Sequence, residues 1–164
     1  MRAPSGATQM HSHVCSIVHV VFGTKQRMQL IPAAVQPRLW NYLAGIARNH
    51  HIQALAVGGT EDHVHLLLRL PPDMALSDAV RTLKANSSRL MRENSPSFTW
   101  QEGYGGFSVS PPQVDGVRRY IANQAAHHHR QSYDEELAAM LRAANFETES
   151  CAAPEGARGG KGDR

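Results

Sequence analysis

The sequence contains little cysteine, few aromatic residues and no long apolar run. Its two cysteines, Cys15 and Cys151, stand near opposite ends of 164 residues, so neither a disulfide framework nor a cysteine-rich zinc site is available. No segment approaches the ~18 to 20 apolar residues of a membrane span, and the opening residues lack the apolar core of a secretory signal. We therefore expect a protein of the reducing cytoplasm that is neither exported nor inserted into a membrane.

The excess of charge is also small. Seventeen Lys and Arg residues against fourteen Asp and Glu residues give a net charge of +3, which permits an anionic partner without requiring one. With 41% hydrophobic residues the chain can bury a core, so wholesale disorder is excluded. The length fits a single domain, expected over residues 13–146. The polar residues 1–12 and the Gly- and Ala-rich residues 147–164 are expected to be flexible tails.

Hydrophobic periodicity predicts an α+β fold. Strands are expected over residues 14–22, 52–57, 63–70 and 100–109, and helices over residues 33–51, 76–94, 114–131 and 135–145. Ser77 or Asp73 could cap the second helix, and Ser110 the third. The order β-α-β-β-α-β-α fits a ferredoxin-like antiparallel sheet with helices packed on one face, followed by a C-terminal helix that carries a tyrosine.

A pair of histidines stands in the third predicted strand. Alternate residues of a strand share a face, so His63 and His65 point the same way while Val64 points to the other side. Two imidazoles on one face can share a metal ion. Taken alone, the pattern is more often explained by two surface or core histidines satisfied by hydrogen bonds, so further ligands must come from elsewhere.

The last long helix offers such a ligand. Tyr120 and Gln124 are four residues apart, so both side chains project from one face, with His127 close to the same stripe. An apolar stripe beside them would dock the helix on the sheet and hold Tyr120 over it. From this helix alone, the preferred interpretation of Tyr120 is a half-buried anchor whose hydroxyl meets solvent.

Together these segments resemble the single-tyrosine HUH transposases, the small enzymes of IS200-like insertion sequences and of relatives associated with repetitive palindromic elements. The resemblance covers about residues 14–145 and rests on SIVHVVFGTK, GGTEDHVHLLL and GYGGFSVSPPQVDGVRRYIANQAAHH. It implies that His63, His65 and Gln124 bind a divalent metal ion, Mg²⁺ or Mn²⁺, and that Tyr120 is the nucleophile. It further implies a homodimer acting on single-stranded, hairpin-forming DNA, with active sites shared between subunits.

The implied chemistry is DNA strand cleavage and transfer. A tyrosine hydroxyl has a pKa of about 10 and is a poor nucleophile at neutral pH, so help must come from polarisation of the phosphate. Attack would give a 5′-phosphotyrosine and a free 3′ hydroxyl, and a second 3′ hydroxyl could then rejoin strands. Two alternatives stay open: a single-strand-binding module without catalysis, which would expose aromatic residues on the sheet, and a relaxase- or replication-initiator-type nickase.

Positive residues could contact the DNA backbone. The second helix carries its cations opposite its apolar stripe, a pattern that is also typical of a solvated surface. The predicted phosphate contacts are Lys25, Arg27, Arg81, Lys84, Arg89, Arg92, Arg118 and Arg119.

Other side chains could support the ligands from behind or stack on bases. His19 and His127 are candidates for support, as are Glu61 and Asp62, although a polar turn explains the last two equally well. Three aromatic residues near the fourth strand could stack on unpaired bases, but aromatic residues of a strand are more often core. We assign these three to the core: Trp100, Tyr104 and Phe107.

Overall fold

The protein is described here by a computed structural model that covers residues 13–124 and 132–144. The described residues belong to two compact units, residues 1–130 and residues 131–164. Both predicted tails, 1–12 and 147–164, lie outside the described residues. None of the helices in the described ranges combines the length and the apolar character that a membrane crossing requires.

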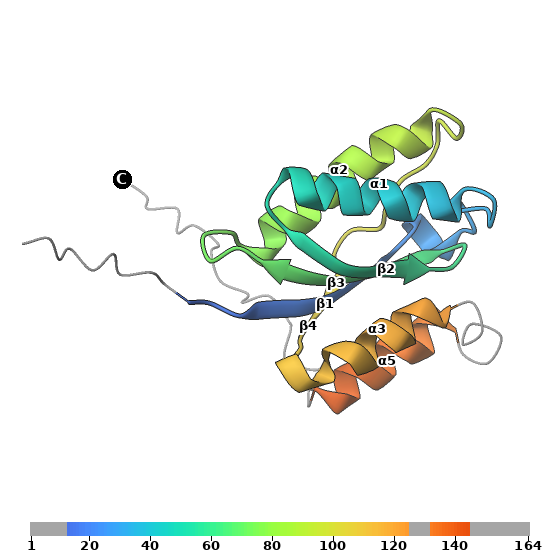
Figure 1. The fold of residues 1–164 in the computed structure, drawn as a ribbon. Coiled ribbons are helices and arrows are strands. Elements are labelled where there is room, and N and C mark those ends of the chain that lie inside the picture. Colours follow the sequence, from blue (N-terminus) through green and yellow to red (C-terminus); the bar gives the residue numbers. More distant parts are fainter. Residues whose placement is uncertain (1–12, 125–131, 145–164) are drawn as a thin grey trace, which may run out of the picture. The chain divides into compact units, whose positions relative to one another are not determined.

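The first unit is built on a four-stranded antiparallel sheet of spatial order β2-β3-β1-β4 (Figure 1). The strands are β1 (Ser16–Gly23), β2 (Gln53–Gly59), β3 (His63–Leu70) and β4 (Gly105–Ser108). The helices are α1 (Gln36–Asn49), α2 (Leu76–Arg92) and α3 (Val114–Ala122), with short 3-10 turns at η1 (Lys25–Arg27) and η2 (Pro111–Gln113). The predicted α+β class with an antiparallel sheet is confirmed.

The central strand β3 is buried on both of its faces. Its even-numbered residues Val64, Leu66 and Leu68 belong to the main core together with residues of α1 and α2. Leu67, from the other face, packs in a smaller apolar cluster against Ile121 of α3. Helices therefore cover both sides of the sheet, with α1 and α2 on one side, as predicted, and α3 on the other (Figure 1).

Aromatic rings close the main core where the chain enters β4. Trp100 meets Phe22 and Phe98 edge-on, with ring centroids 4.9 Å apart in each pair. The indole N–H of Trp100 donates to Ser87 Oγ at 2.9 Å, and Ser87 in turn donates to the Leu83 carbonyl. The buried polar atom of Trp100 is thus satisfied, which confirms its assignment to the core.

Helix α3 lies very close to β2. A Cβ atom built on Gly58 would lie 2.7 Å from the carbonyl oxygen of Ile121 and 2.9 Å from its Cγ2. Only glycine allows this approach, because any side chain would push the helix away from the strand. The position of α3 above the sheet therefore depends on Gly58.

The start of the tyrosine helix is set by a local cap. The backbone N–H and the hydroxyl of Ser110 both donate to Gln113 Oε1, at 3.1 and 2.8 Å. Pro111 and Pro112 occupy the first turn, where their missing N–H groups cost no helical hydrogen bond. Ser110 is thus the N-cap residue of η2, the turn that leads into α3, whereas the N-cap position of α3 itself is held by Gln113.

Three details of the predicted elements are wrong. Helix α2 begins after Ala75, without a side-chain cap from Ser77 or Asp73. Helix α3 ends at Ala122, because Asn123 leaves the helical conformation at φ −96° and ψ 13°. Strand β4 spans only four residues, and Trp100 forms an isolated bridge with Thr24 instead of extending it.

The second unit contains, within the described residues, helix α5 (Tyr133–Ala143). Ser132 and Glu135 form a reciprocal cap, in which each backbone N–H donates to the other residue's side chain. The hydrogen bond from the Ser132 backbone lowers the pKa of Glu135 below its ordinary value. The sequence predicted this helix over 135–145, so its start lies two residues earlier.

Replacing Gly58 tests the close approach of α3. We expect Gly58→Ala to lower the free energy of unfolding by about 1–3 kcal/mol, because the added methyl group overlaps Ile121. Gly45→Ala in α1 is the matched control: its Cβ meets nothing within 4 Å, so loss of backbone entropy in the unfolded chain should raise stability by about 0.5–1 kcal/mol. Urea denaturation followed by circular dichroism measures both, and equal stabilities would contradict the interpretation.

Candidate active site

Three elements bring polar side chains together on the α3 side of the sheet. His63 and His65 come from β3, His19 from β1, and Tyr120 from α3. In the antiparallel register His19 is paired with Leu67 and Val21 with His65, so His19 and His65 are diagonal neighbours on one face. All three histidines are buried. The sequence did not show which face of β1 carries His19. The structure places it on the same face of the sheet as His65.

The imidazole of His63 is held by the turn that precedes β3. Its Nδ1 lies 2.7 Å from Asp62 Oδ1 and 3.0 Å from Thr60 Oγ1, and the Thr60 hydroxyl also donates to Asp62 at 2.9 Å. An ionised carboxylate only accepts, so His63 Nδ1 carries a hydrogen, and in the neutral imidazole Nε2 then carries the lone pair. Asp62 therefore sets both the tautomer and the orientation of His63, the arrangement typical of histidine ligands.

A second contact of this kind lies behind His65. His65 Nδ1 is 2.9 Å from His19 Nε2, and the two rings are 5.1 Å apart. When His65 Nδ1 donates to His19, the lone pair of His65 is at Nε2, the same nitrogen as in His63. His19 thus has the position relative to His65 that Asp62 has relative to His63.

Tyr120 lies beside this histidine pair. The centroid of its ring is 5.8 Å from that of His65 and 6.0 Å from that of His19, and both contacts are edge-on. Its neighbour Ile121 is buried in the smaller apolar cluster, which fixes the helix beneath the ring. The half-buried Tyr120 is therefore positioned by its own chain next to its own chain's histidines.

Gln124 follows the end of α3 and still reaches β3. Its side-chain oxygen Oε1 lies 3.4 Å from His63 Nε2, and the residue is buried. In the neutral tautomer with its hydrogen on Nδ1, His63 Nε2 and Gln124 Oε1 are both electron-pair donors across this distance. A pair of neutral N and O donors facing each other fits a divalent cation, so the predicted ligands His63, His65 and Gln124 are chemically suited to one.

The predicted cations are divided among three places. Arg118 and Arg119 are exposed on α3, the helix of the tyrosine, while Lys25 and Arg27 lie in η1. The remaining four lie on α2, on the other side of the sheet. Several are engaged within the chain: Arg81 pairs with Asp78, Arg27 donates to the Gln101 side chain, and Arg92 Nε donates to the Phe98 carbonyl.

Among the supporting residues, the structure separates Asp62 from Glu61. Asp62 contacts His63 directly, whereas Glu61 contributes its backbone carbonyl to the Ile31 N–H at 2.9 Å. Thr60 was not among the predicted residues, although its place three residues before the His-x-His pair is visible in the sequence. His127 lies outside the described residues.

Of the three aromatic residues assigned to the core, Tyr104 is misassigned. Its side chain is 38% exposed, because it stands before β4 begins and its segment leaves the sheet. Phe107 is half-buried in β4, with its ring centroid 6.5 Å from that of His19.

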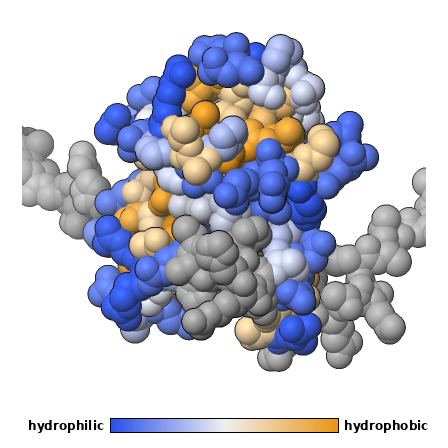
Figure 2. Space-filling model, turned by 90° about the vertical axis from the view of Figure 1, so that its right-hand side faces the viewer, coloured by the Kyte–Doolittle hydropathy of each residue, from blue (hydrophilic) through white to orange (hydrophobic). Residues whose placement is uncertain are grey.

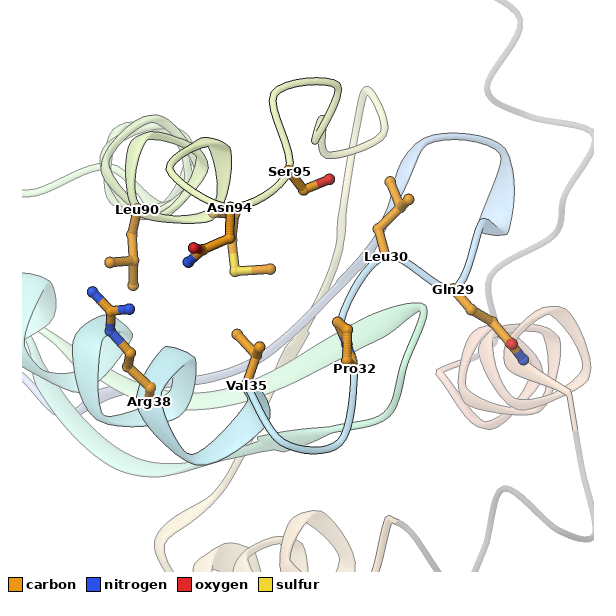
Figure 3. Close-up of a pocket in the computed structure, with 9 residues that line it drawn as sticks. Gln29, Leu30, Pro32, Val35, Arg38, Leu90, Asn94 and Ser95 are labelled. Carbon is orange, nitrogen blue, oxygen red and sulfur yellow. The ribbon is translucent and has the colours of Figure 1, made fainter.

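An apolar hollow of about 300 Å³ lies elsewhere, between the segment that leads into α1 and the end of α2. Figure 2 shows hydrophobic residues between hydrophilic ones in the upper part of the molecule. Figure 3 shows Leu30, Val35 and Leu90 around the hollow, with Arg38 at its edge. The residues that line it include no histidine, tyrosine, lysine or carboxylate, so among them there is no usual general acid or base.

An antiparallel sheet with paired histidines beside a helix-borne tyrosine is the arrangement expected of a single-tyrosine transposase. The family model described as "Transposase IS200 like" matches residues 12–124, more than half of the chain, and the protein belongs to this family.

Two curated relatives are similar over different lengths. The ISDra2 transposase TnpA of Deinococcus radiodurans is 29% identical over 114 residues, which cover 65% of this chain and 81% of the relative. The transposase for insertion sequence element IS200 of Salmonella typhimurium is 29% identical over 75 residues, 46% of this chain and about half (49%) of the relative.

Two solved structures share the fold. A transposase candidate from Deinococcus radiodurans R1 aligns with a TM-score of 0.57 and 28% identity, covering 71% of this chain and 97% of that chain. A REP-associated tyrosine transposase bound to a REP hairpin aligns with a TM-score of 0.55 and 16% identity, covering 75% of this chain and 74% of that chain, and it supports the fold alone.

Proposed function

We propose that this transposase cleaves and rejoins single-stranded DNA through a covalent bond to Tyr120. The observation that carries the proposal is the position of the Tyr120 ring, 5.8 Å from that of His65 and within one compact unit. Membership of the IS200-like family supports strand cleavage and transfer as the reaction class. Hairpin-forming DNA is the proposed substrate, in keeping with the REP hairpin bound by one structural neighbour.

The proposed first step exchanges one phosphate ester for another. The oxygen of Tyr120 attacks the phosphorus, the bond between phosphorus and the 3′ oxygen breaks, and the tyrosine proton is balanced by protonation of the leaving 3′ oxygen. The products are a 5′-phosphotyrosine and a 3′ hydroxyl. In the second step another 3′ hydroxyl attacks the phosphotyrosine, so a phosphodiester forms again and Tyr120 regains its proton. The number of ester bonds is conserved, so no nucleotide cofactor is required.

A divalent metal ion, Mg²⁺ or Mn²⁺, is the proposed cofactor, held by His63, His65 and Gln124. When bound, such an ion supplies polarisation of a phosphate oxygen and stabilises developing negative charge. The chain's own contribution is orientation. The contacts of Asp62 with His63 and of His19 with His65 orient the two imidazoles, and in the tautomer with hydrogen on each Nδ1 the lone pair of each ring is on Nε2.

The non-catalytic alternative is disfavoured by the sheet itself. A single-strand-binding sheet needs an open face with exposed aromatic residues. In this chain one face is covered by α1 and α2, and the other carries His19, His63 and His65 beneath α3. A nickase would share the first step, so the rejoined product distinguishes transfer from nicking.

Tyr120→Phe is expected to abolish the covalent adduct while folding and DNA affinity stay nearly unchanged, because only the attacking oxygen is removed. The measurement is denaturing gel electrophoresis of labelled single-stranded DNA from the flanking genomic region, incubated with protein and Mg²⁺. Tyr42→Phe on α1 is a matched control and should form the adduct normally. An adduct formed by the Tyr120→Phe protein would exclude Tyr120 as the nucleophile.

Metal binding can be measured without DNA. We expect His63→Ala to lose most Mn²⁺ affinity in an electron paramagnetic resonance titration, since one imidazole and one amide hold the ion poorly. Asp62→Asn should weaken binding by about 10–100-fold through loss of orientation. The exposed His50 at the end of α1 provides the control, since His50→Ala should leave the titration unchanged. Full cleavage in EDTA would reject the metal site.

The proposed assembly is a homodimer, and the site within it can be tested by complementation. Tyr120 lies beside His65 of the same chain, so we propose that this arrangement is catalytically complete, in contrast to the sharing implied by the resemblance. Mixed His63→Ala and Tyr120→Phe subunits should then stay inactive after proven exchange. Recovered cleavage would show instead that tyrosine and histidines from different subunits combine.

A further inference from the structure

The backbone of His19 is held in the sheet from both sides. Strand β1 lies between β3 and β4, and the register pairs His19 with Leu67 of β3 and with Phe107 of β4. The residue is buried, with 6% of its surface exposed. An inner strand cannot shift without breaking hydrogen bonds to both neighbouring strands. His19 therefore keeps one position relative to the histidines of β3.

Three aromatic rings lie close to the imidazole of His19. Its centroid is 5.1 Å from that of His65, 6.0 Å from that of Tyr120 and 6.5 Å from that of Phe107. His19 Nε2 lies 2.9 Å from His65 Nδ1, a hydrogen-bond distance. Because Nδ1 of His65 faces His19, Nε2 is the nitrogen that His65 can offer to a metal ion.

The hydrogen bond between these two histidines has two possible directions. If His65 Nδ1 donates, the neutral ring of His65 has its lone pair on Nε2. If His19 Nε2 donates, His65 Nδ1 accepts, and Nε2 of His65 carries the hydrogen and cannot bind a cation. In water a neutral imidazole side chain mostly carries its hydrogen on Nε2, so the first direction has to be imposed by the surroundings.

We propose that His19 is a positioning residue, which accepts the hydrogen of His65 Nδ1 and so keeps the lone pair of His65 on Nε2. The inference rests on the proposed function, because the place of this lone pair matters only if His65 binds a metal ion. It also makes the two ligands unequal. The Asp62 carboxylate is a charged acceptor for His63, whereas His19 is a neutral and therefore weaker acceptor for His65.

The first test determines the tautomer of His65 in the metal-free protein. Histidines are labelled with nitrogen-15, and long-range proton–nitrogen NMR correlation at mildly alkaline pH distinguishes the nitrogen that carries hydrogen from the nitrogen with the lone pair. The His65 signals are those missing from His65→Ala. We expect hydrogen on Nδ1 in the unchanged protein and on Nε2 in His19→Leu, which has no acceptor. Hydrogen on Nε2 in the unchanged protein, or on Nδ1 in both proteins, would overturn the proposal.

The second test is the Mn²⁺ titration by electron paramagnetic resonance. His19→Leu should weaken binding by about 10–100-fold, the loss typical of residues that orient a metal ligand. His19→Gln should restore most of the affinity, because its amide reaches the position of Nε2 and can turn its oxygen toward His65 Nδ1. Unchanged affinity in His19→Leu, or equally weak binding in His19→Gln, would contradict the role of His19 as an acceptor.

Ile17 provides the matched control for damage to the sheet. It lies two residues before His19, on the same face of β1, and is buried in the smaller apolar cluster. Ile17→Ala should lower the melting temperature by leaving a cavity, with the Mn²⁺ affinity and the His65 tautomer unchanged. An affinity loss as large as that of His19→Leu would mean that any damage to this face is sufficient, and would reject a specific role for His19.

These readings fail separately from the proposed function. A covalent Tyr120 adduct in the unchanged protein, combined with failure of both His19 tests, rejects the role of His19 alone. No adduct in the unchanged protein rejects the proposed function. The tautomer of His65 is measured without metal or DNA, so it decides in either case whether His19 sets the position of the lone pair.

Discussion

The two-residue alternation of β3 is the constraint on which the rest of the structure depends. Val64, Leu66 and Leu68 face the main core, while His63 and His65 face α3. Both faces are covered from His63 to Leu68, so this part of β3 has no solvent-exposed side where a shift in register would be tolerated. A shift of one residue in its pairing with β1 or β2 would put imidazoles in the core and leucines in the active site. Stability and chemistry are therefore fixed by the same strand register.

Much of this arrangement follows from the sequence, because its signals are local. The His-x-His pair in an apolar strand predicts the shared face, and Ser110 before two prolines predicts the start of the tyrosine helix. The orientation of His19 could not be read in this way, since β1 is apolar on both sides and no polar residue marks a solvent face. The contact of His19 with His65 appears only when the antiparallel register is known.

The contacts of the positively charged side chains on α2 were harder to predict than the position of the helix. The sequence of α2 predicts that its positively charged residues lie opposite its apolar stripe, and in the structure none of them is among the buried residues of the helix. A helical projection does not include the neighbouring segment, residues 101–103, which lies against α2. Lys84 therefore donates to a backbone carbonyl group of this segment, whereas Arg81 stays exposed. The same segment takes Tyr104 out of the sheet, which explains why an aromatic residue assigned to the core is exposed. Both differences come from a glycine-rich connection without periodicity.

The cap at Ser110 has a consequence for how this sequence can vary. Each residue added to or removed from a helix rotates everything beyond it by about 100°. Tyr120 follows Ser110 by ten positions. Ser110, at the start of this interval, is hydrogen-bonded to Gln113, and Ile121, directly after its end, packs against Gly58 of β2. Substitutions within the interval leave the direction of the tyrosine intact, whereas a single insertion or deletion turns it away from the histidines. Related sequences with the same chemistry should therefore conserve the length of this interval more strictly than its composition.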